Sequence, residues 1–335
     1  MLENCTKIIP EQKLGFKNVL IKPCLSSIVS RKDVCVDVEY NFKWSNKSWK
    51  GVPIIAANMD TTGTIEMAKV LNHNNILTCL HKFYSYDDWH NIKDDINDYY
   101  SITIGSDNFE HLSIVLSSLP HINIITIDVA NGYRLCFLDF IKKVRQQFTD
   151  KIIIAGNVTT PEMAVEIINA GADIVKVGIG GGSACSTTNI TGIGYPQLAA
   201  ILECAPAVHA IGGKIISDGG CKEVGDIAKA FCAGADFVML GGMLAGHDES
   251  GGKLVEKNDK IYKEFYGMSS TQAQEKYYQG MKNYRASEGK SSLVEYRGPV
   301  QDTINTILGG LRSTCTYTNS SNLTELVENG KFIRV

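Results

Sequence analysis

The feature that most constrains this chain is a series of short apolar runs, each followed by a polar or glycine-bearing segment. About 22 to 28 residues separate the starts of neighbouring runs, except between the sixth and seventh, where about 41 do. Such runs are typical of strands in a parallel sheet that is buried on both faces. The runs are Val52–Ala57, Ile76–Leu80, Ile102–Ile104, Ile124–Ile127, Ile152–Ala155, Ile174–Val177, Ile215–Ser217 and Phe237–Leu240.

Helix-like stretches lie between most of these runs. In Thr160–Ala170 and Glu223–Ala233, apolar residues recur at the three- and four-residue spacing of an amphipathic helix. Repeated strand–helix units of this number fit a closed barrel better than an open sheet, because an open sheet needs a reversal of strand order that the sequence does not display. We therefore predict the α/β class and a (β/α)8 TIM barrel.

The whole chain, residues 1–335, is expected to form one catalytic barrel domain. This length also fits two average domains of about 150 residues each, but no shift in composition marks a boundary. Residues 1–50 are interpreted as an N-terminal extension, and residues 243–297 as a lid inserted after the eighth strand. Val300–Leu311 is the expected closing helix.

Charge and hydropathy exclude several classes of partner. The chain has 33 Lys and Arg against 36 Asp and Glu, which gives no general surface for nucleic acid or an anionic membrane. No apolar run approaches the roughly 20 residues of a membrane-spanning helix. The ten cysteines are scattered singly, without a CxxC pair. We expect a cytoplasmic protein with reduced thiols and no nucleic-acid or membrane partner.

Polar residues at the ends of the predicted strands mark the expected active site, since barrels of this kind carry their sites in the loops that follow the strands. Turns are rich in Asp and Asn in any case, so each residue alone is equally consistent with a simple turn. Polar ends in register along the chain favour a site. The residues are Asp60, Lys82, Asp128, Asn157 and Asp218.

The sixth loop, Gly178–Pro196, is the most unusual segment. Its glycines let backbone amides and carbonyls face a ligand. A lone cysteine is usually a small buried hydrophobe, as we expect for Cys79 and Cys232. In this loop Cys185 is favoured as a nucleophile, provided that its surroundings lower its pKa. We reject a dinucleotide fingerprint at Gly178-x-Gly180, because the segment is expected to continue as loop until about Pro196.

The seventh and eighth strands end in Ser217-Asp-Gly-Gly220 and Gly241-Gly242. Loops in these positions are the usual phosphate site of a (β/α)8 barrel, because their backbone N–H groups bind the oxyanion. Asp218 has the chemistry to accept hydrogen bonds from ribose hydroxyls. The combination indicates a mononucleotide, and the alternative is that the glycines serve only tight turns.

The predicted lid contributes the strings Tyr266–Ser270 and Tyr284–Gly289. A long, partly polar insertion of this kind is suited to folding over the mouth of a barrel and excluding water. Arg285 has the chemistry to bind phosphate or stack on a base, and Glu288 to exchange a proton. Taken alone, each of the two is more typical of a surface charge.

Together these segments resemble the IMP dehydrogenase and GMP reductase family, and the resemblance spans nearly the whole chain. His81-Lys82, Phe265–Ser270 and Tyr284–Lys290 favour the reductase branch. Dehydrogenases typically insert a regulatory domain of about one hundred residues where this chain has only Tyr84–Ser101. The shared strings are Ala56-Ala-Asn-Met-Asp60, Asp128-Val-Ala-Asn-Gly132, Ala155-Gly-Asn-Val158, Gly178–Pro196, Ser217–Gly220 and Gly241–Gly246.

The resemblance implies reductive deamination of GMP to IMP and ammonia with NADPH as the cofactor, in a homotetramer. It implies that Cys185 forms a covalent thioimidate with the purine, while Thr187 and Glu288 handle the proton for ammonia. Hydride and water compete for the same carbon, and the lid decides between them.

The resemblance also assigns binding residues. The expected GMP contacts are Ser183, Asp218, Gly219, Gly220, Gly241, Gly242, Met268, Ser269, Arg285, Ser287 and Gly289. The expected cofactor contacts within one subunit are Lys82, Asp128, Val129, Ala130, Ile179, Gly180 and Tyr284. Those expected across a subunit contact are Ser30, Arg31, Ser313, Thr314, Cys315 and Thr316. The backbone carbonyls of Gly180, Gly182 and Cys185 match a potassium (K+) site.

The sequence departs from the family pattern at Gly181, where proline is usual, and at Thr188, where arginine is usual. Three alternatives stay open beside the reductase hypothesis. One is IMP dehydrogenase activity, and another is a nucleotide-binding protein without catalysis. The third is a Schiff-base lyase that uses Lys176 on the sixth strand, which requires a lysine with a lowered pKa.

Overall fold

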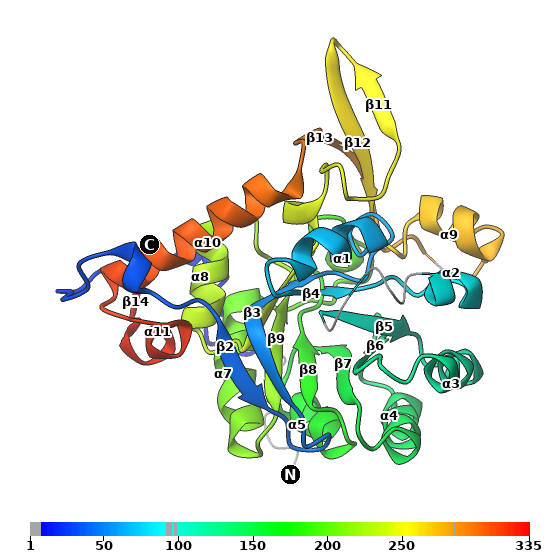
Figure 1. Ribbon diagram of the computed structural model, residues 1–335, viewed down its shortest axis with the longest axis horizontal. Helices are drawn as coiled ribbons and strands as arrows, with labels where there is room; N and C mark the ends of the chain where they lie inside the picture. Colours follow the sequence, from blue (N-terminus) through cyan, green and yellow to red (C-terminus); the bar gives the residue numbers. More distant parts are fainter. Residues whose placement is uncertain (1–7, 92–95, 97–98, 285) are drawn as a thin grey trace.

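The computed structural model describes residues 8–91, 96, 99–284 and 286–335. Across these residues, eight parallel strands pair in chain order from β3 to β10, and β10 pairs back with β3 to close a barrel. Figure 1 shows helices packed around this barrel, so the predicted (β/α)8 fold is confirmed. The strands are β3 (Ser48–Ala56), β4 (Ile76–Cys79), β5 (Tyr100–Ile104), β6 (Ile124–Asp128), β7 (Ile152–Val158), β8 (Ile174–Val177), β9 (Lys214–Asp218) and β10 (Phe237–Leu240).

The helices around the barrel follow the strands in sequence. The helical spacing in Thr160–Ala170 and Glu223–Ala233 corresponds to α5 (Pro161–Asn169) and α8 (Val224–Cys232). The closing helix, α10 (Val300–Tyr317), continues beyond the predicted Leu311. The others are α1 (Ile65–Asn72), α2 (Tyr86–Asn91), α3 (Phe109–Ser118), α4 (Leu135–Gln147) and α7 (Gln197–Ala210).

The expectation of continuous loop up to Pro196 is wrong in one place. A short helix, α6 (Thr187–Thr191), interrupts the segment. It ends at Gly192, which has a φ of 73° and donates its N–H to the carbonyl of Thr188. A residue with positive φ is a common end for a helix, and glycine adopts it without strain.

The barrel interior is apolar with a small polar layer. Cys79 and Cys232 are buried, as predicted, and the described cysteines are all free thiols. Inside the barrel, the Thr126 hydroxyl lies 2.8 Å from the Ser101 hydroxyl and 3.4 Å from the Cys79 sulfur. These groups satisfy one another, so the layer is a packed core rather than a ligand site.

The N-terminal segment folds back on the barrel. It contains η1 (Phe16–Asn18), β1 (Val19–Ile21), η2 (Arg31–Asp33) and β2 (Val38–Asn41). β2 pairs antiparallel with the first residues of β3. Because of this pairing, the first barrel strand begins at Ser48, before the predicted start at Val52. β1 pairs antiparallel with β14 (Phe332–Arg334), which follows α11 (Leu323–Asn329), so segments near the two ends of the chain lie together (Figure 1).

Residues 243–297 interrupt the strand–helix alternation with a sheet that projects from the barrel (Figure 1). Its base is fixed by Lys263, whose buried ammonium donates to the carbonyls of His247, Asp248 and Ser250. The elements are β11 (Leu254–Lys257), β12 (Lys260–Tyr266), α9 (Thr271–Tyr278) and β13 (Ser291–Glu295), preceded by η3 (Gly242–Leu244).

The end of the barrel opposite the strand carboxyl ends is fixed by Asp173, immediately before β8. Its side chain accepts the backbone N–H groups of Trp44, Ser45 and Ile153 and pairs with the Arg145 guanidinium at 2.7 Å. A buried carboxylate with this many donors ties the N-terminal segment, β7 and α4 together.

Among the described helices, none is both long and apolar enough to cross a bilayer.

Candidate active site

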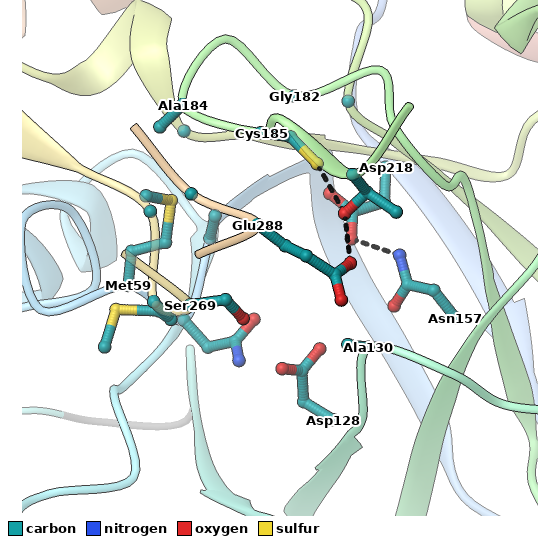
Figure 2. A pocket seen from close by; sticks show the side chains of 18 of the residues that line it. Met59, Asp128, Ala130, Asn157, Gly182, Ala184, Cys185, Asp218, Ser269 and Glu288 are labelled. Carbon is teal, nitrogen blue, oxygen red and sulfur yellow. Dashed lines mark hydrogen bonds between the residues drawn. The ribbon is translucent and has the colours of Figure 1, made fainter. Parts of the chain in front are cut away.

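A cavity of about 850 Å³ opens at the carboxyl ends of the barrel strands. Residues at or after the end of each barrel strand contribute to its wall, as expected for a (β/α)8 barrel. The insertion of residues 243–297, for which we keep the name lid, adds Met268, Ser269 and Glu288 to the wall. In Figure 2, side chains from the barrel loops and from the lid converge on this one space.

Cys185, Thr187 and Glu288 form a hydrogen-bonded series at the cavity. The Cys185 thiol lies 3.3 Å from the Thr187 hydroxyl, and that hydroxyl donates to Glu288 Oε2 at 2.8 Å (Figure 2). Cys185 is partly accessible rather than buried. The series joins a thiol to a carboxylate through a hydroxyl, an arrangement through which a proton can pass between the sulfur side and the carboxylate.

Backbone hydrogen bonds hold the lid against the loop that carries Cys185. Ser186 donates its N–H to the Glu288 carbonyl at 2.8 Å, and Lys290 donates to the Ala184 carbonyl at 2.9 Å. The two bonds flank an antiparallel bridge between Cys185 and Gly289. The catalytic candidates from two distant parts of the chain are therefore fixed by main-chain geometry.

This approach of backbones depends on glycine. A Cβ added at Gly289 would lie 2.7 Å from the Ser270 nitrogen and 3.2 Å from the Gly267 Cα. A Cβ at Gly267 would lie 2.7 Å from the Ala184 carbonyl oxygen. The backbone segments around Ala184, Gly267 and Gly289 thus stack at distances that leave no room for a side chain at either glycine.

Glycine pairs form the other side of the cavity. Gly219 and Gly220, after β9, have φ values of 89° and 85°, and Gly220 donates its N–H to the Gly181 carbonyl. A Cβ at Gly242 would lie 2.2 Å from the Ser183 hydroxyl oxygen, so that hydroxyl packs directly on the second glycine pair. The arrangement presents exposed main chain and a hydroxyl, which suits an oxyanion such as phosphate.

An ion triad, which we define as Lys176, Asp128 and Asp218, lies at the cavity. The Lys176 side chain is buried, whereas those of Asp128 and Asp218 are 34% and 22% exposed. Lys176 Nζ is 2.6 Å from Asp128 Oδ1 and 3.1 Å from Asp218 Oδ2. Burial opposes the charge of Lys176, but the two carboxylates outweigh it and raise the pKa of this lysine. A Schiff-base lyase needs a neutral amine, so the triad argues against the Lys176 alternative.

Burial likewise disfavours the charge of Asp128, and Lys176 outweighs it, so the pKa of Asp128 lies below its ordinary range. Asn157 donates to Asp218 Oδ2 at 2.8 Å and to the Gly178 carbonyl at 2.8 Å. Asn157 therefore helps to hold the substrate-side carboxylate in place (Figure 2).

The cofactor contacts predicted within one subunit all line the cavity, Lys82 among them. The Lys82 ammonium is 5.6 Å from the centre of the Phe83 ring and 5.7 Å from that of Tyr278. The aromatic rings keep this cation beside the cavity. The other members of the set that line the cavity are Asp128, Val129, Ala130, Ile179, Gly180 and Tyr284.

Most of the predicted GMP contacts also line the cavity: Ser183, Asp218, Gly219, Gly220, Gly241, Gly242, Met268, Ser269 and Gly289. Ser287 does not, since its hydroxyl donates to the Gly289 carbonyl. Arg285 lies outside the described residues.

The predicted contacts across a subunit boundary lie away from this cavity. Ser30 and Arg31 begin η2, which packs on α10, and α10 carries residues 313–316. The Cys315 side chain is fully buried, so it has no exposed surface to offer a cofactor. The hydroxyls of Ser313 and Thr314 donate to carbonyls of their own helix.

Asp60, which the strand-end pattern indicated, is not at the cavity. It is buried, and its Oδ2 accepts from the Tyr266 and Tyr277 hydroxyls at 2.6 and 2.8 Å and from Lys276 at 3.0 Å. Asp60 thus anchors α9 of the lid to the barrel. Its position at the end of a strand could not distinguish an anchor from a ligand.

Sequence reasoning missed several residues that line the cavity. Asn58 lies in the recognised string after β3, and Ser106 and Arg134 lie after β5 and β6. Arg134 donates to the Ser106 hydroxyl at 3.2 Å. Their positions just after strands were the available signal.

Among the described residues, no cluster of three His, Cys, Asp or Glu side chains suits a metal ion.

Comparison with known proteins places this geometry in context. A family model described as the IMP dehydrogenase / GMP reductase domain matches residues 13–335. The chain is 52% identical over 335 residues to the GMP reductase of Citrobacter koseri, covering 98% of this chain and 96% of that protein. The GMP reductases of Enterobacter sp. (strain 638) and Klebsiella pneumoniae show the same identity and coverage.

The glycine stack yields a prediction about the lid. Gly289→Ala is expected to break the bridge at Cys185, because the added Cβ would lie 2.7 Å from backbone. Hydrogen–deuterium exchange at the Ser186 and Lys290 amides should then accelerate. Gly309→Ala is the matched control, since nothing lies within 4 Å of its added Cβ. Unchanged exchange in the Gly289 variant would contradict the proposed stacking.

Proposed function

The chain belongs to the IMP dehydrogenase / GMP reductase family, and we propose that it catalyses the reductive deamination of GMP to IMP and ammonia with NADPH. The observation that carries the proposal is the series Cys185–Thr187–Glu288 at the cavity, with hydrogen bonds of 3.3 and 2.8 Å. Curated relatives at 52% identity are named GMP reductase, which supports the choice of reaction.

In this proposal the glycine pairs after β9 and β10, with Ser183, bind the phosphate of GMP. Asp218 Oδ2 is already engaged by Asn157 and Lys176, so Oδ1 remains for the ribose hydroxyls. Met268 and Ser269 from the lid face the base. The phosphate-binding glycines and Cys185 lie on neighbouring loops. GMP bound through these contacts would therefore have its purine beside Cys185.

The covalent step begins at the Cys185 sulfur. As sulfur bonds to C2 of the purine, the thiol proton passes through Thr187 to Glu288. The bond from C2 to the exocyclic amine then breaks, and ammonia departs with that proton, which Thr187 relays back from Glu288. The covalent thioimidate that remains is electrophilic at C2. When bound, the NADPH supplies a hydride to that carbon, after which the carbon–sulfur bond breaks and IMP leaves.

Exclusion of water decides the outcome at C2, since hydrolysis of the same thioimidate would give a different product. The lid places Met268, Met281 and Tyr278 on the cavity wall. These mainly apolar surfaces limit the room for water beside C2 and add no base to Glu288. We infer that the closed lid favours hydride over solvent.

The cofactor would lie on the side of Lys82, Asp128 and Tyr284. Ser30, Arg31 and residues 313–316 lie outside this cavity, so a neighbouring subunit is required if they are to take part. A homotetramer would supply that neighbour. Lys82 and Arg31 are the cations suited to the additional phosphate of NADPH.

We propose that the backbone carbonyls of Gly180, Gly182 and Cys185 bind a potassium ion; the Gly182 carbonyl also accepts the Cys185 N–H at 3.0 Å. This donor set consists of neutral backbone carbonyls, which suit a weakly hydrated monovalent cation better than a divalent one. Thr188 helps to shape this loop, since a Cβ at Gly180, which has a φ of 83°, would meet its hydroxyl. K+ bound there would order the loop that holds the nucleophile.

The potassium proposal predicts an effect on stability and activity. Replacing KCl by LiCl at equal ionic strength is expected to lower the melting temperature and slow turnover, because a smaller ion leaves the carbonyls poorly satisfied. Calorimetry provides the readout that is independent of activity. Equal melting temperatures in the two salts would exclude K+ binding at this loop.

The covalent mechanism predicts the behaviour of Cys185→Ala. Wild-type protein should oxidise NADPH only when GMP is present, as followed at 340 nm, and should not reduce NAD with IMP. The variant should lose turnover by at least about 10⁴-fold, yet bind GMP with nearly unchanged affinity, since phosphate and ribose contacts lie elsewhere. Cys136→Ala, at an exposed cysteine on α4, is the matched control. Substantial turnover without the sulfur would refute covalent catalysis.

The relay predicts a separate effect for Glu288→Gln. Turnover should fall about 10² to 10⁴-fold, because the departing ammonia loses its proton source. The dissociation constant of GMP, measured by calorimetry, should change less than threefold. Glu295→Gln on β13, a lid glutamate paired with Lys260, is the control and should behave as wild type. Weakened binding with normal turnover would contradict the assigned role.

A further inference from the structure

We propose that Lys176 is a positioning residue for this reaction, because its ammonium joins the carboxylate that faces the cofactor to the carboxylate that faces the ribose. The inference rests on the proposed function and deepens it. Asp128 and Asp218 lie on opposite sides of Lys176, at the ends of β6 and β9. One buried side chain thus connects the two halves of the site.

The Lys176 ammonium is fully occupied within the protein. Its side chain is 2% exposed. Nζ lies 2.6 Å from Asp128, 3.1 Å from Asp218 and 3.5 Å from the Asn58 side-chain oxygen. An ammonium has three N–H donors, and these oxygens account for them. Nζ also lies 3.8 Å from the Met239 sulfur. Lys176 lines the cavity, but its N–H groups are engaged by these protein atoms, so we assign it a role through its neighbours.

The hydrogen bonds of Lys176 select which oxygens face the cavity. Lys176 and Asn157 both engage Oδ2 of Asp218, and Lys176 engages Oδ1 of Asp128. The second oxygen of Asp218 remains for a ligand, whereas Asp128 has a further hydrogen bond with the Asn58 side chain. Because both rotamers depend on one ammonium, a shift of Lys176 would move the ribose acceptor and the cofactor-side group together.

The charge of Lys176 is as important as its position. Without it, two partly exposed carboxylates would lie close together, and like charges at short range favour protonation of one of them. The pKa of Asp128 lies below its ordinary range because Lys176, assisted by Lys82, outweighs the cost of burial. The other titratable groups that interact with the triad include the Cys79 thiol on β4 and the Cys221 thiol after β9, and Glu288 on the lid lines the same cavity.

A protonated carboxyl is a poorer acceptor for ribose hydroxyls than a carboxylate. Loss of the ammonium should therefore weaken GMP binding most at low pH and least at high pH. A residue that served only to stabilise the fold would show no such dependence on pH. This difference separates positioning from a structural role.

The test is Lys176→Met in the full-length protein. At pH 7 the KM for GMP should rise at least about tenfold. The acid limb, meaning the part of the pH profile where kcat/KM falls as the pH is lowered, should move to higher pH by about one unit or more. Raising the pH should restore much of the GMP affinity. Lys263→Met is the matched control, since it also removes a buried ammonium but one bound only to carbonyls of residues 247–250. It should lower stability without moving the acid limb.

Two further variants keep the test decisive if Lys176→Met does not fold. Lys176→Arg retains the charge and should keep the acid limb within about 0.3 pH units of wild type, even if turnover falls. In an Asp218→Asn background, Lys176→Gln should cost less than twofold in GMP affinity, because residues that act as a unit are not additive. Additive losses would overturn the inference.

The outcomes distinguish the two proposals. If wild-type protein shows no GMP-dependent oxidation of NADPH, the proposed function fails. If wild type is active and Lys176→Met folds with an unmoved acid limb and a KM for GMP within threefold of wild type, only the inference about Lys176 fails.

Discussion

The pairing of β10 with β3 is the constraint on which the site depends. In register, Val238 lies opposite Ile54 and Leu240 opposite Ala56, so the last strand hydrogen-bonds to the first and the sheet has no open edge there. Parallel strands in a closed barrel end on one rim. Loops separated by most of the chain, such as Asn58 and Gly241, therefore share one cavity wall. An open sheet with the same strands would leave these loops at opposite edges.

A second contact completes the site from outside the barrel. Thr187 and Glu288 are 101 residues apart in sequence, yet they share a hydrogen bond of 2.8 Å. The lid reaches this position because Gly267 and Gly289 let three backbones stack, and because Asp60 anchors α9 through Tyr266, Lys276 and Tyr277. The reaction proposed here needs both parts, since the sulfur comes from the barrel and the proton from the lid. In the proposed reaction, the bridge between Cys185 and Gly289 would hold the sulfur and the carboxylate of the relay in place together.

The sequence predicted the barrel well because buried parallel strands are continuous apolar runs, and the eight predicted strands are present across the described residues. It also identified the loop of Cys185, whose glycine content is unusual. It could not separate Asp60 from Asp128, since both follow strands and only tertiary packing makes one an anchor and the other a cavity residue. It missed α6, because five residues give too little periodicity to detect. Lys176 was noticed for its position on a strand, but its partners come from β6 and β9 and are invisible in local sequence.

The ion triad explains how a packed barrel interior tolerates charge beside a ligand site. A buried ammonium without partners would be costly, and so would two unpaired carboxylates, whereas three groups with complementary hydrogen bonds satisfy one another. The triad also leaves one negative charge in excess, at the side where ribose hydroxyls and the cofactor would lie. That excess suits donors of hydrogen bonds and a nicotinamide that becomes cationic when it gives up hydride. It is unfavourable for phosphate, which instead has the neutral glycine loops and Ser183. Under the proposed function, the separation of these two environments around one cavity would favour one orientation of the nucleotide, with its base directed toward Cys185.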